Sequence, residues 1–460
     1  MRTHDLVIVG AGSGNAIVDD RFSHLDVAIV DEGPFGGTCL NRGCIPSKML
    51  GHVADLADGV REAGSLGVDA TLQGVRWADV RERVFGRLDR EAAEGEEGRR
   101  ETPYVHVYKG HARFTEERTL LVGAGDDTVR IRGEQVVVAA GSRPTVPGQV
   151  AESGLPYETS DTVMRLERPP RHLAVLGGGY VAAELAHVFH AAGSRITVIE
   201  QADTLLAAQD EAVSAAYTEI AAGRYDVRTG TALTRVEGAP GGLGLVLDDG
   251  TTVEADTLLV AVGRTPNGDR IQAARAGIDR HGDGRIVVDA FQRTTAPGVF
   301  ALGDVCTPFP LKHVANREAE VVAHNLLHPD DLVRTVHEAV PAAVFTRPQI
   351  AQVGRTEREC REEGLDYAVS VRRFSDSAYG WALEDGTGFC KVLADRATGL
   401  LLGAHILGPQ AATLIQPLVV AMSLGIDAAT LARTPYWIHP AATETVSNAL
   451  LGLDLDASTP

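Results

Sequence analysis

Two cysteines, Cys39 and Cys44, lie five residues apart in a glycine-rich segment. On an ideal helix, residues at this spacing have Cα atoms roughly 8–9 Å apart, whereas a disulfide needs them within about 7 Å. A bridge therefore requires a distorted segment, and Asn41 and Gly43 permit such a distortion. Inert buried thiols or zinc ligands are the alternatives, but zinc would need two further ligands at suitable spacing and none stand nearby. The pair therefore favours redox chemistry.

A glycine fingerprint precedes the cysteines. It contains Gly10, Gly12 and Gly14, ends at Asn15, and is followed by the acidic residue Asp31. Such glycines let the backbone approach a diphosphate at a helix N-terminus, and the acid accepts a hydrogen bond from a ribose hydroxyl. Asn15 stands where a third glycine is usual, a departure that would loosen helix–strand packing. A simple glycine-rich turn is the alternative to this dinucleotide site.

A second fingerprint repeats the first at domain scale. Gly177, Gly179 and Ala182 occupy its three positions, and Glu200 follows where the acid is expected. Two dinucleotide sites in one chain suggest that electrons pass from one cofactor to the other.

Both fingerprints must be positioned by the same local elements. Apolar runs at 6–9 and 27–30 predict two strands joined by a glycine turn and a helix, and runs at 173–176 and 196–199 predict the same plan. The pattern of apolar runs changes near residue 340. We expect an α/β fold divided into residues 1–150 and 266–336, which bind FAD, residues 151–265, which bind NAD(P)H, and residues 337–460, an interface domain.

Composition excludes several classes of function. The chain has 460 residues and a net charge of −19, so its surface repels nucleic acid. No run of eighteen apolar residues is present, and we expect neither a membrane span nor a secretory segment. An odd number of cysteines argues against a structural disulfide framework. We expect a cytoplasmic protein without a metal centre.

The sequence resembles the pyridine nucleotide–disulfide oxidoreductases, the family that includes glutathione reductase and dihydrolipoamide dehydrogenase. Besides the cysteine segment and the fingerprints, the matching segments are 140–144, 261–267, 300–304, 344–348 and 439–444. The resemblance covers essentially the whole chain. It implies two Rossmann-like dinucleotide-binding domains, a C-terminal α+β dimerisation domain, bound FAD, NAD(P)H as reductant and a homodimer.

The resemblance also implies the catalytic roles. Cys39 matches the thiol that attacks a substrate disulfide, and Cys44 matches the thiol that faces the flavin. His439 matches the general acid–base, which the other subunit supplies in this family, and Glu444 matches the carboxylate that orients it. An imidazole suits proton transfer to a thiolate near neutral pH. Pro440 is expected at the first position of the helix that follows.

Four further residues match positions around the flavin. Lys48 and Glu184 match a pair beside its reactive edge, Asp304 matches the acid that binds the ribityl chain, and Tyr180 matches the side chain that covers the flavin where nicotinamide enters. The remaining residues expected to contact cofactor are Gly37, Thr38, Gly141 and Gly263.

A smaller set of segments resembles one branch of the family, which reduces a low-molecular-weight disulfide carrying sugar groups. These segments are 160–165, 311–316, 378–381, 436–440 and 448–452. A small-molecule disulfide is therefore the expected substrate. A lipoamide dehydrogenase and a redox-inactive nucleotide-binding protein are the alternatives. Trp381 is expected to serve packing rather than substrate contact.

The nucleotide preference departs from the resemblance, which alone implies NADPH. Arginines hold the 2′-phosphate in members that favour NADPH, but here Gln201 follows Glu200 and the next arginine is Arg224. Two unit charges about 4 Å apart interact by about 4 kcal/mol at an effective dielectric of 20, which solvent and salt reduce to about 1–2 kcal/mol. We therefore expect NADH to be used at least as well as NADPH, unless a distant cation folds in.

Overall fold

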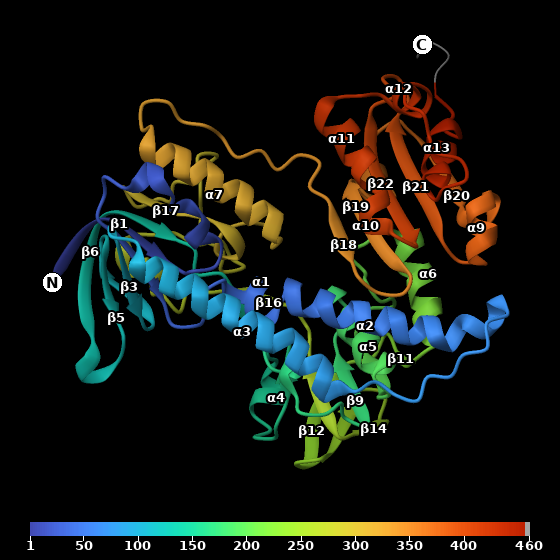
Figure 1. Cartoon of the computed structure of the whole chain (residues 1–460), viewed down its shortest axis with the longest axis horizontal. Coiled ribbons are helices and arrows are strands. Elements are labelled where there is room, and N and C mark those ends of the chain that lie inside the picture. Colours follow the sequence, from blue (N-terminus) through green and yellow to red (C-terminus); the bar gives the residue numbers. More distant parts are fainter. Residues whose placement is uncertain (456–460) are drawn as a thin grey trace.

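The computed structural model describes residues 1–455, which form three sheet-based units, and the chain returns to the first unit after completing the second (Figure 1). The first sheet has the order β3-β2-β1-β6-β5-β4, and a further strand, β17, pairs with β6. Its parallel strands are β1 (Arg2–Val9), β2 (Val27–Asp31), β3 (Val105–Lys109), β6 (Val129–Val138) and β17 (Val299–Ala301). The antiparallel strands β4 (Ala112–Glu116) and β5 (Thr119–Val122) extend it beyond β6. The continuous apolar runs are buried on both faces, as parallel strands require.

The helix expected after the first fingerprint is absent, and this prediction was wrong. Two short 3₁₀ helices, Ser13–Ile17 and Asp20–Phe22, connect β1 to β2 instead. Arg99 explains the difference, because its guanidinium donates to the carbonyl oxygens of Asn15 (2.8 Å) and Val18 (2.9 Å). In an α-helix these carbonyls would accept the amides four residues later. Arg99 also donates to the Asn15 side chain at 2.7 Å, which gives Asn15 a structural role here.

The second sheet repeats the core topology of the first. Its parallel strands have the order β11-β10-β9-β15-β8, namely β11 (Asp226–Arg228), β10 (Arg195–Ile199), β9 (His172–Leu176), β15 (Thr257–Val260) and β8 (Glu158–Thr159). Helix α5 (Tyr180–Ala191) follows the fingerprint, as expected, and α6 (Glu211–Ala222) follows β10. An antiparallel meander lies between β11 and β15, made of β12 (Leu233–Ala239), β13 (Gly242–Leu247) and β14 (Thr252–Ala255).

The third unit is an antiparallel sheet of five strands, drawn in orange and red in Figure 1. In sheet order these are β18 (Ala342–Val344), β19 (Gln349–Gly354), β22 (Leu401–Gly408), β21 (Phe389–Asp395) and β20 (Tyr367–Arg373). Its helices are α8 (Glu357–Glu362), α9 (Ala378–Leu383), α10 (Ala411–Leu414), α11 (Gln416–Leu424), α12 (Ala428–Arg433) and α13 (Thr443–Leu451). The change from parallel to antiparallel strands confirms an α/β fold with a C-terminal α+β unit.

Long helices and a short ribbon connect these units. Helix α2 (Cys44–Glu62) follows the short α1 (Gly37–Arg42) and packs against α5 of the second unit (Figure 1). The remaining helices are α3 (Trp77–Glu101), α4 (Gly148–Ala151) and α7 (Lys312–Leu327), and the ribbon consists of the paired strands β7 (Ser142–Pro144) and β16 (Arg264–Pro266). Because α2 begins at Cys44, the redox segment lies where the first and second units meet. Within residues 1–455, no helix is both long and apolar enough to cross a membrane.

A buried ionic cluster ties the second unit to the third. Lys391 of β21 lies 2.8 Å from Asp210, which caps α6, and 2.6 Å from Glu357 of α8. His405 of β22 is fully buried beside them, and its Nε2 donates to the carbonyl oxygen of Arg355 at 2.9 Å. Charged groups this deep persist only when they are paired, so the cluster fixes how the two units dock.

Candidate functional site

A cavity of about 1170 Å³ is lined by most of the residues expected from the sequence. The expected residues that line it are Gly10, Gly12, Asp31, Gly37, Thr38, Cys39, Cys44, Lys48, Gly141, Tyr180, Glu184 and Asp304. They come from the first fingerprint, from the end of β2, from α1, α2 and α5, and from the segments before β7 and α7. Residues separated by hundreds of positions in sequence therefore share one site.

Cys39 and Cys44 form a disulfide in the cavity wall. Helix α1 ends at Arg42 and α2 begins at Cys44, with Gly43 between them at φ −139° and ψ −118°. This interruption brings the two Cα atoms to 4.7 Å, well under the spacing of a continuous helix. A Cβ atom on Gly43 would lie only 2.9 Å from the Thr38 carbonyl oxygen. The expected distortion at Gly43 is therefore confirmed.

Lys48 and Glu184 meet inside the same cavity. The Lys48 ammonium group lies 2.9 and 2.8 Å from the two carboxylate oxygens of Glu184, across 136 residues of sequence. Glu184 also accepts a hydrogen bond from the backbone amide of Phe345 at 3.0 Å. The Lys48 ammonium group lies 4.7 Å from the centre of the Phe345 ring. The pair places one half-buried cation a single helical turn beyond Cys44.

The first fingerprint forms a backbone cradle that fits a dinucleotide. Gly10 has φ +110°, and a Cβ there would lie 2.2 Å from the Ala139 carbonyl oxygen. A Cβ on Gly37 would lie 2.7 Å from the Gly12 Cα, so only glycines allow the two segments to meet. Gly14 instead packs against Ile8 within the core. The cradle lines the cavity and leaves backbone groups open to a diphosphate.

Asp31 is hydrogen-bonded to the backbone of the first fingerprint. Its carboxylate accepts from the amides of Ala11 (2.6 Å) and Gly33 (2.7 Å). Burial raises the pKa of Asp31, although these hydrogen bonds act in the opposite direction. The neighbouring Glu32 also lines the cavity and pairs with Arg270 at 3.1 Å. Sequence reasoning did not single out Glu32, which offers a second acceptor on the same strand end.

Asp304 is held by a small polar network. Ser142 donates to its carboxylate at 2.6 Å, and Arg264 donates to Ser142 at 2.8 Å. The preceding Gly303 donates its amide to the buried Glu318 of α7 at 2.7 Å. Ser142 and Arg264 lie in the segments that match the family, but their contact with Asp304 could not be read from spacing.

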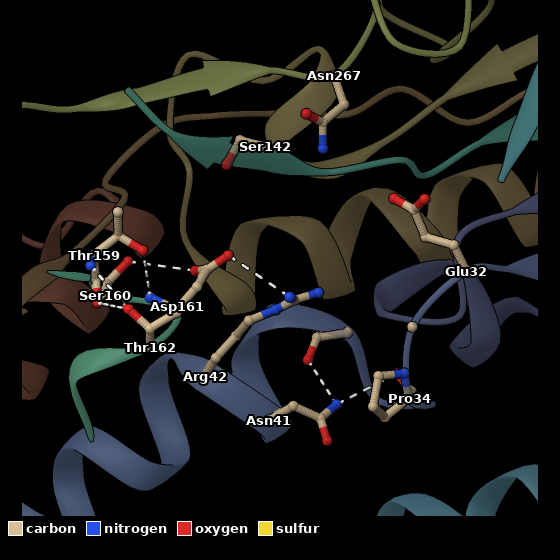
Figure 2. Close-up of polar contacts among 12 residues, drawn as sticks. Glu32, Pro34, Asn41, Arg42, Ser142, Thr159, Ser160, Asp161, Thr162 and Asn267 are labelled. Atoms are coloured by element: carbon tan, nitrogen blue, oxygen red, sulfur yellow. Dashed lines mark hydrogen bonds and ion pairs between the residues drawn. The ribbon is translucent and has the colours of Figure 1, made fainter. Parts of the chain in front are cut away.

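Arg42 reaches out of the cysteine segment toward Asp161, as Figure 2 shows. The Arg42 guanidinium lies 3.7 Å from the Asp161 carboxylate, which also accepts from Ser160 at 3.5 Å. Asn41 points the other way and donates to the carbonyl oxygens of Phe35 and, over a longer distance, Pro34. Arg42 and Asp161 line the cavity. They were missed because neither has a distinctive spacing.

The second fingerprint repeats the geometry of the first at a separate place. A Cβ on Gly177 (φ +110°) would lie 2.5 Å from the Ala261 carbonyl oxygen. The Glu200 carboxylate accepts from the amides of Gly178 (2.5 Å) and Ala202 (2.8 Å), in the manner of Asp31. Gly179 and Gly263 have open space where a Cβ would lie, whereas Ala182 is buried in α5. The glycine turn of the second strand–turn–helix unit therefore has open space at Gly179 and Gly263.

His439 and Glu444 form a pair that stands apart from the cysteine cavity. His439 Nδ1 lies 2.6 Å from Glu444 Oε1, and the histidine side chain is 71% exposed. The expectation for Pro440 was wrong, because α13 begins only at Thr443 and the His439–Pro440 peptide is cis. Glu444 anchors the dyad to the first turn of α13, and the imidazole is exposed to solvent.

The remaining cysteines are buried free thiols: Cys306, Cys360 and Cys390. Burial raises the pKa of Cys306 and Cys360 and raises that of Cys390 to about 12. Trp381 departs from expectation, because its side chain is 65% exposed and packs little within the subunit. Its indole nitrogen donates to the carbonyl oxygen of Ser375 at 2.7 Å.

Comparisons with known proteins agree with this geometry. Residues 4–340 match the model of the pyridine nucleotide-disulphide oxidoreductase family, and residues 340–450 match that of its dimerisation domain. The chain is 49% identical to the mycothione reductase of Mycobacterium tuberculosis, over 98% of this chain and 100% of that protein. It is 32% identical to the dihydrolipoyl dehydrogenase of Haemophilus influenzae, over 96% and 94% respectively.

A solved structure shows the same fold. The Cu(II) complex of the HOCl-induced flavoprotein disulfide reductase from Escherichia coli superimposes with a TM-score of 0.86 at 25% identity, covering 98% of this chain and 99% of that one. With the redox disulfide, the two fingerprints and both family models in agreement, the chain belongs to the pyridine nucleotide-disulphide oxidoreductase family and is an NAD(P)H-dependent disulfide reductase.

Proposed function

We propose that this enzyme reduces mycothione to mycothiol. The observation that carries the proposal is the Cys39–Cys44 disulfide beside Lys48 in the wall of the cavity, on a chain that is 49% identical to a mycothione reductase along nearly its whole length. The domain division 1–150, 151–265, 266–336 and 337–460 is part of the proposal, as is a cytoplasmic location, where a cycling cysteine pair and free thiols suit a reducing compartment.

The residues support a two-stage exchange of thiols. When bound, FAD would carry two electrons from the nicotinamide to the Cys39–Cys44 disulfide. The Cys39 thiolate then attacks one sulfur of mycothione, forming a mixed disulfide and expelling one mycothiol thiolate. Cys44 next attacks the Cys39 sulfur, which restores the disulfide and releases the second mycothiol. Each cycle consumes one hydride and one proton and converts one disulfide into two thiols.

His439 would manage the proton in this exchange. With Glu444 accepting from Nδ1, the imidazole presents Nε2 to a leaving thiolate. Because His439 does not line the cysteine cavity of its own chain, we propose that it completes the site of a partner subunit. The dimerisation domain supports this arrangement.

Hybrid dimers test the shared site. A Cys39→Ala subunit mixed with a His439→Ala subunit should give one working site per hybrid, although each parental homodimer is inactive. Hybrids that are shown to form but have no activity would contradict the assignment of His439 to the partner's site.

For the nucleotide, we propose that NADH is used at least as well as NADPH. Glu200 lies at the end of β10, with its carboxylate fixed at the glycine turn, and would repel a 2′-phosphate. Arg224 is engaged elsewhere, since it donates to Asp58 and to the carbonyl oxygen of Arg347. Arg228 is nearer, with its backbone bonded to Glu200, but its side chain pairs with Asp226 at 2.8 Å.

Steady-state kinetics with both nucleotides decides the matter. A preference for NADPH of tenfold or more would overturn this reading of Glu200. If the Arg228→Ala variant then lost that preference, Arg228 would be the cation that holds the 2′-phosphate. Gln201→Arg should shift the preference toward NADPH.

The substrate is tested by kcat/KM for mycothione, glutathione disulfide and lipoamide with one enzyme preparation. Mycothione should be favoured by at least about tenfold, the equivalent of 1.4 kcal/mol in transition-state binding. A preference for lipoamide would instead support a dihydrolipoamide dehydrogenase.

A further inference from the structure

Within residues 1–455, one lysine of the cavity has no carboxylate partner, whereas each of the other lysines has one. The chain contains four lysines. Lys48 pairs with Glu184, Lys109 with Glu96 and Lys391 with Asp210. These three pairs leave one lysine, Lys312, for which no carboxylate lies within ion-pair distance among residues 1–455.

Lys312 is directed instead at the first fingerprint. It is the first residue of α7, and its ammonium group lies 2.8 Å from the hydroxyl oxygen of Ser13, in the middle of the glycine turn. Both residues line the cavity. The contact joins positions 299 residues apart, and the start of α7 packs over the 3₁₀ helix Ser13–Ile17.

Burial of the Lys312 ammonium group is unfavourable in free energy unless an anion binds beside it. Removal from water is the sole cause that lowers the pKa of Lys312, with no carboxylate raising it. A partly buried ammonium group with a single neutral partner has lost hydration without gaining a charge. A site of this kind is suited to an anionic ligand, and the cavity is where the family binds a dinucleotide.

The local backbone explains why a cation is needed there. In a Rossmann unit the positive end of a long helix helps to hold the diphosphate. Here Arg99 binds the carbonyls of Asn15 and Val18, and the fingerprint is followed by a 3₁₀ helix of five residues and a second one of three residues. So short a helix has few aligned peptide dipoles. We propose that Lys312, together with Ser13, binds the diphosphate of FAD and replaces the missing helix dipole.

The test follows release of FAD from the purified holoenzyme, measured as the rise in FAD fluorescence after dilution. Lys312→Met should release FAD at least about tenfold faster than wild type at low salt, the effect of losing one hydrogen bond to a charged group. Lys312→Arg keeps the charge and should stay within a few-fold of wild type. Wild-type release should accelerate with salt, and release from Lys312→Met should depend on salt less.

Arg317→Met is the matched control, because it removes a cation from the solvent face of the same helix, where Arg317 pairs with Glu320 at 2.8 Å. It should release FAD at the wild-type rate. If Lys312→Met does not fold, Ser13→Ala should still accelerate release several-fold by freeing the ammonium group. Release from Lys312→Met at the wild-type rate would overturn the proposal. So would unchanged release combined with a shifted flavin reduction potential, because the ammonium group would then act on the ring.

Discussion

The carboxylate of Asp210 lies 2.8 Å from the ammonium group of Lys391, and both side chains are buried. Asp210 caps α6 in the second unit, whereas Lys391 belongs to the central part of the C-terminal sheet. This ion pair therefore links the packing of the second unit to that of the third.

Replacing Lys391 should be strongly destabilising. Lys391→Met leaves Asp210 buried without its cation and should lower the unfolding free energy by about 3–5 kcal/mol. The exposed pair of Arg76 and Asp79 is the control, and Arg76→Met should cost under about 1 kcal/mol. Denaturant unfolding of the holoenzyme measures both. If the double variant Lys391→Met/Asp210→Asn recovers none of the unfolding free energy lost in Lys391→Met, then the unpaired Asp210 carboxylate is not the cause of that loss.

Acidification should weaken the same junction through His405. Burial lowers the pKa of His405, with the charge of Asp210 acting against it. Because the folded pKa lies below the unfolded value of 6.5, the unfolded chain binds the proton first as pH falls. The contribution of His405 is complete above about pH 6.5 and is lost progressively below it.

Thermal unfolding midpoints between pH 7.5 and about pH 5 check this expectation. His405→Asn should flatten the decline of the wild type. An equally steep decline in the variant would assign the pH dependence to other groups.

The approach of the redox cysteines should depend on the size of one residue. Gly43→Ala places a Cβ 2.9 Å from the Thr38 carbonyl oxygen, so α1 and α2 must separate. We expect a smaller fraction of disulfide in the oxidised enzyme and a loss of about 1–3 kcal/mol in stability. Gly51→Ala lies on α2 with open space for its Cβ. It should be neutral or stabilising by up to about 1 kcal/mol.

Thiol titration with and without prior reduction, together with denaturant melts, compares these two variants. Equal behaviour of Gly43→Ala and Gly51→Ala would show that the close approach at Gly43 is unimportant.

The two cysteines should differ in their spectra. If Cys44 faces the flavin, two-electron reduction of wild type gives a long-wavelength thiolate–flavin band, and Cys44→Ser abolishes it. Cys39→Ser leaves the Cys44 thiol unpaired and should show the band without reduction. Absorption spectra during anaerobic titration with NADH or dithionite decide the assignment, and a band that survives in Cys44→Ser would reverse the two roles.

The parts predicted from sequence are those written in local patterns. The runs 6–9 and 173–176 gave correct parallel strands because strands buried on both faces are continuously apolar. The need for a break near Gly43 followed from disulfide geometry alone. The pairing of Lys48 with Glu184 came from family resemblance, since no local rule joins residues 136 positions apart.

The parts missed depend on distant partners. Ser13–Ile17 has the sequence plan of a helix start, but Arg99 binds the carbonyls that a helix would use. Ser13 and Lys312 meet only because α7 folds back over the first fingerprint. Such contacts are set by tertiary packing, which single-sequence patterns do not encode.

The burial of Cys306, Cys360 and Cys390 limits which thiols can exchange with the redox pair. Their thiols ionise poorly and none is accessible to a sulfur at the cavity wall, so the Cys39–Cys44 couple has no internal competitor for exchange. Two electrons that enter the pair can leave only to the flavin or to an incoming disulfide. A count of thiols that react quickly with an alkylating reagent in the folded enzyme therefore reads its oxidation level directly.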